Sequence, residues 1–234
     1  LLLGEQIEST RKGAVMPKIT ILAEGSMVNS DVGIIGFCSV LMVEGEKRVV
    51  FDTAHNGRRP YLQARLAALG LTTNDFDLQV LSHAHWDHFQ NCDIFARAPI
   101  LIHRDERRYA RNPHPNDWAT AKWTGAALET MNLVEVGEEY EVMPGCKVIE
   151  LVGHSPGSIG LEVETEDGRC IITGDALHSS ATALAGRNSL VFWSAEQADA
   201  SVRRVVQANA LIYPGHDRPF RLKNGAVQYH TEFH

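Results

Sequence analysis

Residues 83–88 read HAHWDH. The stretch places three imidazoles and a carboxylate directly after the apolar run 78–81. Burying so many polar groups together is costly unless a cation lies among them. His83 and His85 are two positions apart, so in an extended chain their side chains point the same way and can share one ion. Asp87 and His88 follow at an expected helix start, turned toward a different point, where they could hold a second ion.

Three further segments repeat one local pattern, in which an apolar run ends in glycine followed at once by a residue that can bind a metal. The segments are 147–152 with Gly153-His154, 170–173 with Gly174-Asp175, and 210–214 with Gly215-His216. A glycine at that point lets the backbone turn sharply and bring the next side chain over the end of the strand. Ligand sites of open α/β sheets collect at the carboxyl ends of strands, so these side chains are expected to converge.

The pattern H-x-H-x-D-H resembles the signature of the metallo-β-lactamase-fold hydrolases, and all seven ligand positions of that family are filled here. The resemblance extends from about residue 20 to residue 220. It implies an α/β fold, a four-layered αββα sandwich of two mixed sheets flanked by helices. It also implies two metal sites, with His83, His85 and His154 binding one metal, Asp87, His88 and His216 binding the other, and Asp175 bridging them.

The expected cofactor is a pair of divalent metal ions. Imidazole and carboxylate ligands suit Zn²⁺ best here, with Fe, Mn or Co as alternatives. A hydroxide shared by two cations is a strong nucleophile, and the ions can also polarise a carbonyl or phosphoryl oxygen. Asp87 is expected to take up a proton or orient the hydroxide, and to pass a proton to the leaving group. His178 stands three residues after Asp175, where acyl-homoserine lactonases place a Tyr that touches the substrate carbonyl, so His178 is expected to serve as a hydrogen-bond donor to the substrate. Asp52 is expected to orient metal ligands rather than lie in solvent.

The predicted activity is metal-dependent hydrolysis of a small-molecule ester-type bond, with a lactone or ester as first choice in resemblance to the acyl-homoserine lactonases. A thioester is an alternative, because glyoxalase II enzymes share the ligand set. A phosphodiesterase or nuclease is another, because 191–193 and 214–220 resemble small metallo-β-lactamase-domain proteins that include a histone-transcript nuclease. Asp175 argues against β-lactam hydrolysis, since true β-lactamases generally lack Asp there. A binding protein that lost catalysis is the remaining alternative.

Composition and charge limit the classes of substrate and partner that this chain is expected to bind. The chain has 234 residues, a formal net charge of −7 and a sequence pI near 5.9, and no basic stripe of the kind a polyanion needs. The charge therefore favours a small-molecule substrate over a nucleic acid, and a homodimer is left open. Four scattered cysteines suggest reduced thiols in a cytoplasmic protein, and no apolar run is long enough for a membrane span. Residues 1–15 are expected to be a leader or upstream extension, and 16–234 a single domain.

Periodicity and turn signals predict the elements that surround the site. Helices are expected over 58–69 and 194–208, and hairpins around 44–47 and 166–168. Loops are expected over 176–193 and over 25–36, the latter with apolar residues that could form a flap. Asp117 is expected to begin a helix that ends at Met131, with Trp118 and Trp123 either lining a substrate cleft or packing in the core or a dimer. Five other histidines are expected to be structural or exposed: His55, His103, His114, His230 and His234.

Overall fold

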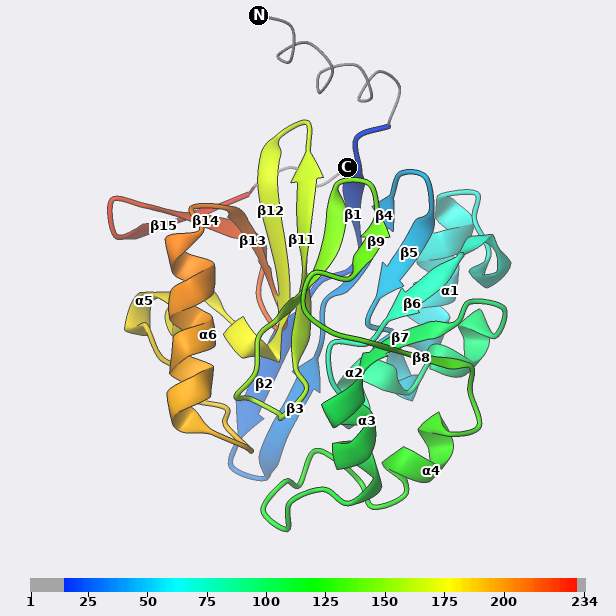
Figure 1. The fold of residues 1–234 in the computed structure, drawn as a ribbon, viewed down its shortest axis with the longest axis horizontal. Coiled ribbons are helices and arrows are strands. Elements are labelled where there is room, and N and C mark those ends of the chain that lie inside the picture. The colour runs from blue at the N-terminus through cyan, green and yellow to red at the C-terminus, as the bar shows by residue number, and fades with distance from the viewer. Residues whose placement is uncertain (1–14, 231–234) are drawn as a thin grey trace, which may run out of the picture.

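The structure, a computed structural model, describes residues 15–230. Two mixed β-sheets pack face to face, with helices α1 to α4 on the side of one sheet and α5 and α6 on the side of the other (Figure 1). This four-layered arrangement confirms the predicted fold class. The expected leader falls almost entirely on residues 1–14, which lie outside the described residues.

The first sheet has the order β1-β4-β5-β6-β7-β8, antiparallel from β1 to β5 and parallel from β5 to β8. The second has the order β15-β14-β13-β12-β11-β10-β9, in which only β12 and β13 pair in parallel. A separate hairpin joins β2 and β3. The strands are β1 (Lys18–Ala23), β2 (Ser26–Ser30), β3 (Gly33–Phe37), β4 (Val40–Glu44), β5 (Arg48–Phe51), β6 (Leu78–Val80), β7 (Ile100–His103), β8 (Leu133–Val136), β9 (Glu141–Met143), β10 (Cys146–Glu150), β11 (Ile159–Thr165), β12 (Gly168–Gly174), β13 (Leu211–Pro214), β14 (Phe220–Lys223) and β15 (Ala226–Tyr229).

The α-helices are short apart from α1 and α6, and four 3-10 turns lie between elements. The α-helices are α1 (Arg59–Ala68), α2 (Trp86–Phe89), α3 (Arg104–Arg111), α4 (Thr124–Leu128), α5 (Ser180–Ala185) and α6 (Ala195–Gln207). The 3-10 turns are η1 (Asn56–Arg58), η2 (Thr73–Asp75), η3 (Cys92–Phe95) and η4 (Asp175–Leu177). Both longer helices begin as the sequence predicts: Pro60 stands in the first turn of α1, and the Ser194 side chain accepts a hydrogen bond from Gln197 N–H at the start of α6.

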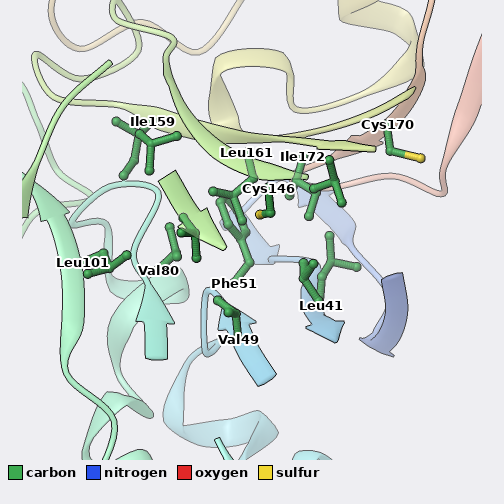
Figure 2. Packing of buried hydrophobic residues seen from close by; sticks show 14 of the residues in the cluster. Leu41, Val49, Phe51, Val80, Leu101, Cys146, Ile159, Leu161, Cys170 and Ile172 are labelled. Carbon is green, nitrogen blue, oxygen red and sulfur yellow. The ribbon is translucent and has the colours of Figure 1, made fainter. Parts of the chain in front are cut away.

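The main core lies between the two sheets. Figure 2 shows side chains of both sheets meeting there, among them Leu41 and Phe51 of the first sheet and Leu161 and Ile172 of the second. Each of these side chains is at most 1% exposed, and burying a large apolar side chain contributes about 1.5–3 kcal/mol. Separate apolar clusters hold α1 on the outer face of the first sheet and α6 on the outer face of the second. The sheets are thus fixed as a rigid frame for the loops at their ends.

Three predicted segments differ from the structure. The helix expected from Asp117 to Met131 is wrong, because only α4 is helical and residues 112–123 run irregularly. Asp117 caps a turn instead, accepting hydrogen bonds from the N–H groups of Ala119 and Thr120. The loop expected over 25–36 is the β2–β3 hairpin, and the loop expected over 176–193 contains α5. Within residues 15–230, no helix is long and apolar enough to cross a membrane.

Candidate metal centre

Three histidines converge at the ends of β6 and β10 to form the first pocket, defined by His83, His85 and His154. His154 Nε2 lies 3.2 Å from His83 Nε2 and 3.0 Å from His85 Nδ1. Metal–nitrogen bonds of 2.0–2.1 Å in a tetrahedron place neighbouring ligand atoms about 3.3 Å apart. All three rings are at most 2% exposed. The three nitrogens therefore have the spacing of ligands to one ion.

The second pocket, defined by Asp87, His88 and His216, lies beside the first. His216 Nε2 is 3.4 Å from Asp87 Oδ2, and His88 Nε2 is 3.8 Å from the same oxygen. Asp87 and His88 lie on α2, the helix that begins inside the histidine motif, while His216 follows β13. The helix start directs the donor atoms of these two side chains toward a separate point, as the sequence predicts, while the His88 ring still packs 4.1 Å from the His83 ring.

Asp175 stands between the two pockets. Its Oδ1 lies 3.2 Å from His216 Nε2 and 3.5 Å from His88 Nε2, whereas its Oδ2 lies 3.7 Å from His154 Nε2. One carboxylate oxygen thus faces each pocket. The structure brings together all seven residues that the sequence singled out as metal ligands.

Glycines shape this convergence in two different ways. Gly153 and Gly174 have φ values of 135° and 52°, which side chains rarely tolerate, so here the glycine permits the turn. Gly215 adopts no such conformation. A Cβ at Gly215 would lie 2.2 Å from Asp175 Oδ1, so this glycine is required for close approach. A glycine precedes the metal-binding residue at all three strand ends, as predicted. At Gly215 the reason is the lack of room for a side chain beside Asp175.

Asp52 orients two of the imidazoles, as expected from its place after β5. Its Oδ2 accepts from His88 Nδ1 at 2.7 Å and from the Ser82 hydroxyl at 2.7 Å, and Ser82 Oγ lies 2.9 Å from His83 Nδ1. Asp52 itself has φ 55°, an unusual conformation for a residue with a side chain, which turns its carboxylate under the motif. The strain is held by a buried network around the site.

The two pockets differ in their electrostatics. Burial and the neighbouring rings lower the pKa of His154 to about 3 and hold the pKa of His83 well below its usual value, so these two imidazoles are neutral. In the second pocket burial acts in the same direction, but Asp175 outweighs it and raises the pKa of His216. Neutral imidazole and carboxylate are the forms that bind a metal ion.

Sequence reasoning missed Glu106, a fully buried carboxylate on α3. It accepts hydrogen bonds from Ala84 N–H at 2.8 Å, from the Ser155 hydroxyl at 2.6 Å and from Gly157 N–H at 3.0 Å. Ala84 stands between two histidines of the first pocket, and Ser155 follows the third. Glu106 therefore ties together the two loops that build this pocket. The sequence around Glu106 gave no indication of its burial, because four arginines of α3 surround it and make the segment look like a solvent-exposed helix.

Those arginines face away from the site. Arg107 and Arg111 pair with Glu129, and Arg108 lies 3.4 Å from Asp105. They form a solvated helix face with surface ion pairs rather than an anion site.

Aromatic side chains wall the first pocket. Phe192 stands edge-on to His85 and His154, with ring centroids 4.9 and 5.5 Å away. Trp118 packs edge-on against Phe192 at 5.5 Å and is 62% exposed. Trp123 is also exposed and packs near Phe89, so neither tryptophan lies in the core. Trp118 is therefore part of an aromatic wall beside the first pocket.

The β2–β3 hairpin lies against the second pocket. His216 Nδ1 donates to Ser26 O at 3.2 Å, and a Cβ at Gly36 would lie 2.2 Å from Asp87 Oδ2. The apolar hairpin residues Val28, Ile34 and Ile35 are about half exposed. The predicted flap is thus an anchored wall rather than a loose loop.

Two histidines outside the seven also lie near the site. His178 Nε2 is 2.8 Å from the Thr182 hydroxyl and 3.1 Å from the Ser189 hydroxyl, and burial lowers the pKa of the ring. His55, expected to be structural or exposed, packs against Trp86 of the histidine motif with ring centroids 5.2 Å apart. Its position could not be deduced from sequence, because it depends on how the turn after β5 packs on α2.

The donor set fits a pair of metal ions. Within the described part of the chain, His88 Nε2 and Asp175 Oδ1 are buried side-chain atoms without a hydrogen-bond partner, and they face each other across the second pocket. Leaving such atoms unpaired is costly, and a cation between them would remove that cost. The three histidines of the first pocket and Asp175 make four groups whose ligand atoms all lie within 4.8 Å of one another, so they can likewise hold one ion.

The fold is an αββα sandwich, and groups of His and Asp side chains that could hold metal ions lie at one end of its sheets. The sequence model of the metallo-beta-lactamase superfamily matches residues 34–216. The chain belongs to the metallo-beta-lactamase superfamily, and the predicted family is confirmed.

Individual relatives are more distant. An N-acyl homoserine lactonase from Bacillus sp is 28% identical over 159 residues, which cover 65% of this chain and 60% of the relative. The chain therefore spans less than two thirds of the length of such lactonases. Metallo-beta-lactamase domain-containing protein 1 from Xenopus laevis is 27% identical over 194 residues, covering 81% of this chain and 75% of the relative.

Solved structures agree on the fold. B. thuringiensis AiiA with N-decanoyl-L-homoserine at its active site superposes with a TM-score of 0.71 at 22% identity, covering 87% of this chain and 94% of AiiA. A probable metal-dependent hydrolase from Staphylococcus aureus gives a TM-score of 0.75 at 17% identity, covering 94% of this chain and 99% of that hydrolase. At these identities the likeness establishes the fold alone.

Proposed function

We propose that the chain is a dinuclear metal-dependent hydrolase that cleaves an ester-type bond of a small molecule, with a lactone as the first candidate. The observation that carries this proposal is Asp175, which presents one carboxylate oxygen to each pocket. A bridging carboxylate is the feature that distinguishes a two-ion centre from two separate sites. The lactonases among the relatives support the choice of a lactone.

The residues that would hold the ions are the six of the two pockets together with Asp175. When bound, a pair of divalent ions such as Zn²⁺ supplies a water of lowered pKa and a Lewis acid for the scissile carbonyl. The chain's own part is to keep His83 and His154 unprotonated and to hold Asp175 between the pockets. Phe192 covers the edges of His85 and His154 and keeps bulk water from that side of the first pocket.

Asp87 and His178 are the proposed groups that act on substrate. Asp87 is 6% exposed at the rim of the second pocket, where its carboxylate can hold a proton and pass it to the leaving group. His178 has a lowered pKa, because burial disfavours its charged form, so its ring is neutral near pH 7. If the Thr182 hydroxyl donates to Nε2, the ring proton stays on Nδ1 and is free to donate to a substrate carbonyl.

A phosphodiesterase or nuclease is the second candidate, because residues 191–193 and 214–220 resemble the small metallo-β-lactamase-domain proteins that include a histone-transcript nuclease. The X. laevis metallo-beta-lactamase domain-containing protein 1 aligns over 81% of the chain, more than the first lactonases do. The net charge of −7 favours a small substrate over a polyanion. We also infer a cytoplasmic protein, and the four buried, unpaired cysteines support this.

The test combines metal analysis with a substrate panel on one preparation. Inductively coupled plasma mass spectrometry should give two metal ions per chain, and Asp175→Asn should lose at least one of them. The panel contains lactones, esters, thioesters, bis-nitrophenyl phosphate and a short RNA. Turnover of a lactone or ester supports the first candidate, and turnover confined to the phosphodiesters supports the second. A protein with two metals and no turnover of any of these would contradict both.

A further inference from the structure

The imidazoles of the metal centre share a pattern in their outward-facing nitrogens. His83 Nδ1 faces the Ser82 hydroxyl, His88 Nδ1 faces Asp52, His154 Nδ1 donates to Leu190 O at 2.6 Å and His216 Nδ1 donates to Ser26 O. An acceptor at this nitrogen fixes the tautomer of a metal-binding histidine and the orientation of its ring. His85 is the fifth imidazole, and it presents Nδ1 rather than Nε2 to the first pocket.

His85 Nε2 faces a buried carboxylate. Asp117 Oδ1 lies 3.4 Å from this nitrogen, and both side chains are almost completely buried. If a metal ion is bound at Nδ1, the ring proton must be on Nε2, and a buried N–H needs an acceptor. The separation is slightly longer than an ordinary N–H···O hydrogen bond, and His85 Nε2 has no other hydrogen-bond partner among the described residues.

Asp117 is itself firmly placed. The Tyr109 hydroxyl donates to Oδ2 at 2.8 Å, and the N–H groups of Ala119 and Thr120 donate to Oδ1 at 2.9 Å each. The loop is tied back to the histidine motif, since Trp86 N–H donates to Ala119 O at 3.1 Å. The carboxylate is therefore aimed at His85 by contacts on both of its oxygens.

We propose that Asp117 is a positioning residue for His85, which holds the ring as the Nε2–H tautomer with Nδ1 directed into the first pocket. Tyr109 is the group that fixes Asp117 in turn. This inference rests on the proposed function only in that the first pocket binds a metal ion. The proposal assigns a role to the irregular segment 112–123, which contains Asp117. Trp118, the residue after Asp117, contributes to the aromatic wall. One short loop thus sets both a ligand and part of the surface beside it.

The variants separate positioning from mere turn formation. Asp117→Asn keeps an amide oxygen that can accept from Ala119 and Thr120, so the turn survives while the charged acceptor is lost. Tyr109→Phe removes only the hydroxyl that holds Asp117, and this variant replaces Asp117→Asn in the test if Asp117→Asn does not fold. Asp105→Asn, an exposed carboxylate on the neighbouring helix α3, is the matched control.

Two readouts are independent of turnover. Stepwise Zn²⁺ affinities are measured by competition with a chromophoric chelator, and the His85 tautomer is measured by long-range ¹H–¹⁵N NMR of the zinc-loaded protein. We expect Asp117→Asn to weaken one of the two Zn²⁺ affinities by about 10- to 100-fold, Tyr109→Phe by less, and Asp105→Asn not at all. The wild-type His85 ring should carry its proton on Nε2.

Failure of this proposal is distinguishable from failure of the proposed function. A wild-type protein that binds two Zn²⁺ ions, with both affinities kept within threefold in Asp117→Asn, would overturn the role of Asp117 whatever the protein hydrolyses. A His85 ring protonated on Nδ1 would overturn it as well. Conversely, a tautomer and an affinity loss as expected would uphold it even if no substrate of the panel is cleaved.

Discussion

Glu106 offers the sharpest test of how this fold holds its metal centre, because a single buried carboxylate ties two loops that are about 70 residues apart in sequence. The perturbation is Glu106→Gln, which preserves shape and removes the charge. A Gln side chain has one acceptor oxygen and one NH₂ group. If the oxygen keeps the hydrogen bonds from Ser155 and Gly157, the NH₂ group must face Ala84 N–H, donor against donor.

The magnitude follows from this count. A hydrogen bond to a charged group contributes about 1.5–3 kcal/mol, and an unpaired buried donor costs about 1–3 kcal/mol. Because Gln is cheaper to bury than a carboxylate, part of this loss is offset, and we expect a net destabilisation of about 3 kcal/mol. For a domain of this size that corresponds to a fall in Tm of about 6–12 °C. We also expect weaker Zn²⁺ binding in the first pocket, since Ala84 and Ser155 adjoin its ligands.

The assay is differential scanning calorimetry of the metal-free and zinc-loaded protein, with Asp105→Asn on the same helix as control. The control should unfold within about 1 °C of wild type, because exposed ion pairs contribute little. If Glu106→Gln matched the control in both Tm and Zn²⁺ affinity, the carboxylate would support neither the fold nor the pocket. If the Tm fell while Zn²⁺ affinity stayed at the wild-type value, the carboxylate would support the fold but not the pocket, contrary to the prediction.

Three further predictions concern the second pocket, metal removal and pH. Gly36→Ala should weaken Zn²⁺ binding at least tenfold in a chelator competition, because the added methyl would overlap the Asp87 carboxylate; unchanged affinity would mean that the hairpin moves freely. Zinc at about 100 times its Kd should raise the Tm of metal-free protein by about 5–10 °C, seen by calorimetry, and no shift would contradict a folded metal site. Burial alone would raise the pKa of Glu138, but the hydrogen-bonded Arg204 lowers it below its ordinary value of 4.5. The Glu138–Arg204 pair therefore stabilises the fold above about pH 4.5, and this stabilisation is lost as the pH falls and Glu138 takes up a proton. In Glu138→Gln the free energy of unfolding, measured between pH 6 and pH 3, should depend less on pH; an identical profile would remove the pair from the acid response.

Much of the metal centre is encoded in short stretches of the chain. The spacing of His83 and His85, the helix start at Asp87, and glycine before each later ligand depend on neighbouring residues alone, so they can be deduced before any tertiary contact is known. The hairpins and the long helices α1 and α6 are likewise local, because turn residues and caps act within a few positions. The four layers, by contrast, were predicted from the resemblance to the metallo-β-lactamase family.

The segment 112–123 is the opposite case. Its two prolines exclude a regular helix over 113–115, yet nothing local says where the chain goes afterwards. Asp117 was expected to begin a helix because its capping chemistry is the same in a helix and in an isolated turn. Contacts with Tyr109 and His85 decide between them, and these depend on how α3 packs against the histidine motif.

The residues that can bind metal, the strands that carry them, the supporting Asp52 and the family of the chain were all predictable from the sequence. Only the folded structure shows that Glu106 and Asp117 hold the metal-binding loops and rings, because both are ordinary acidic residues until packing removes them from water. Burial is the physical reason for the difference, since a carboxylate becomes a directing group only where solvent no longer competes for its hydrogen bonds.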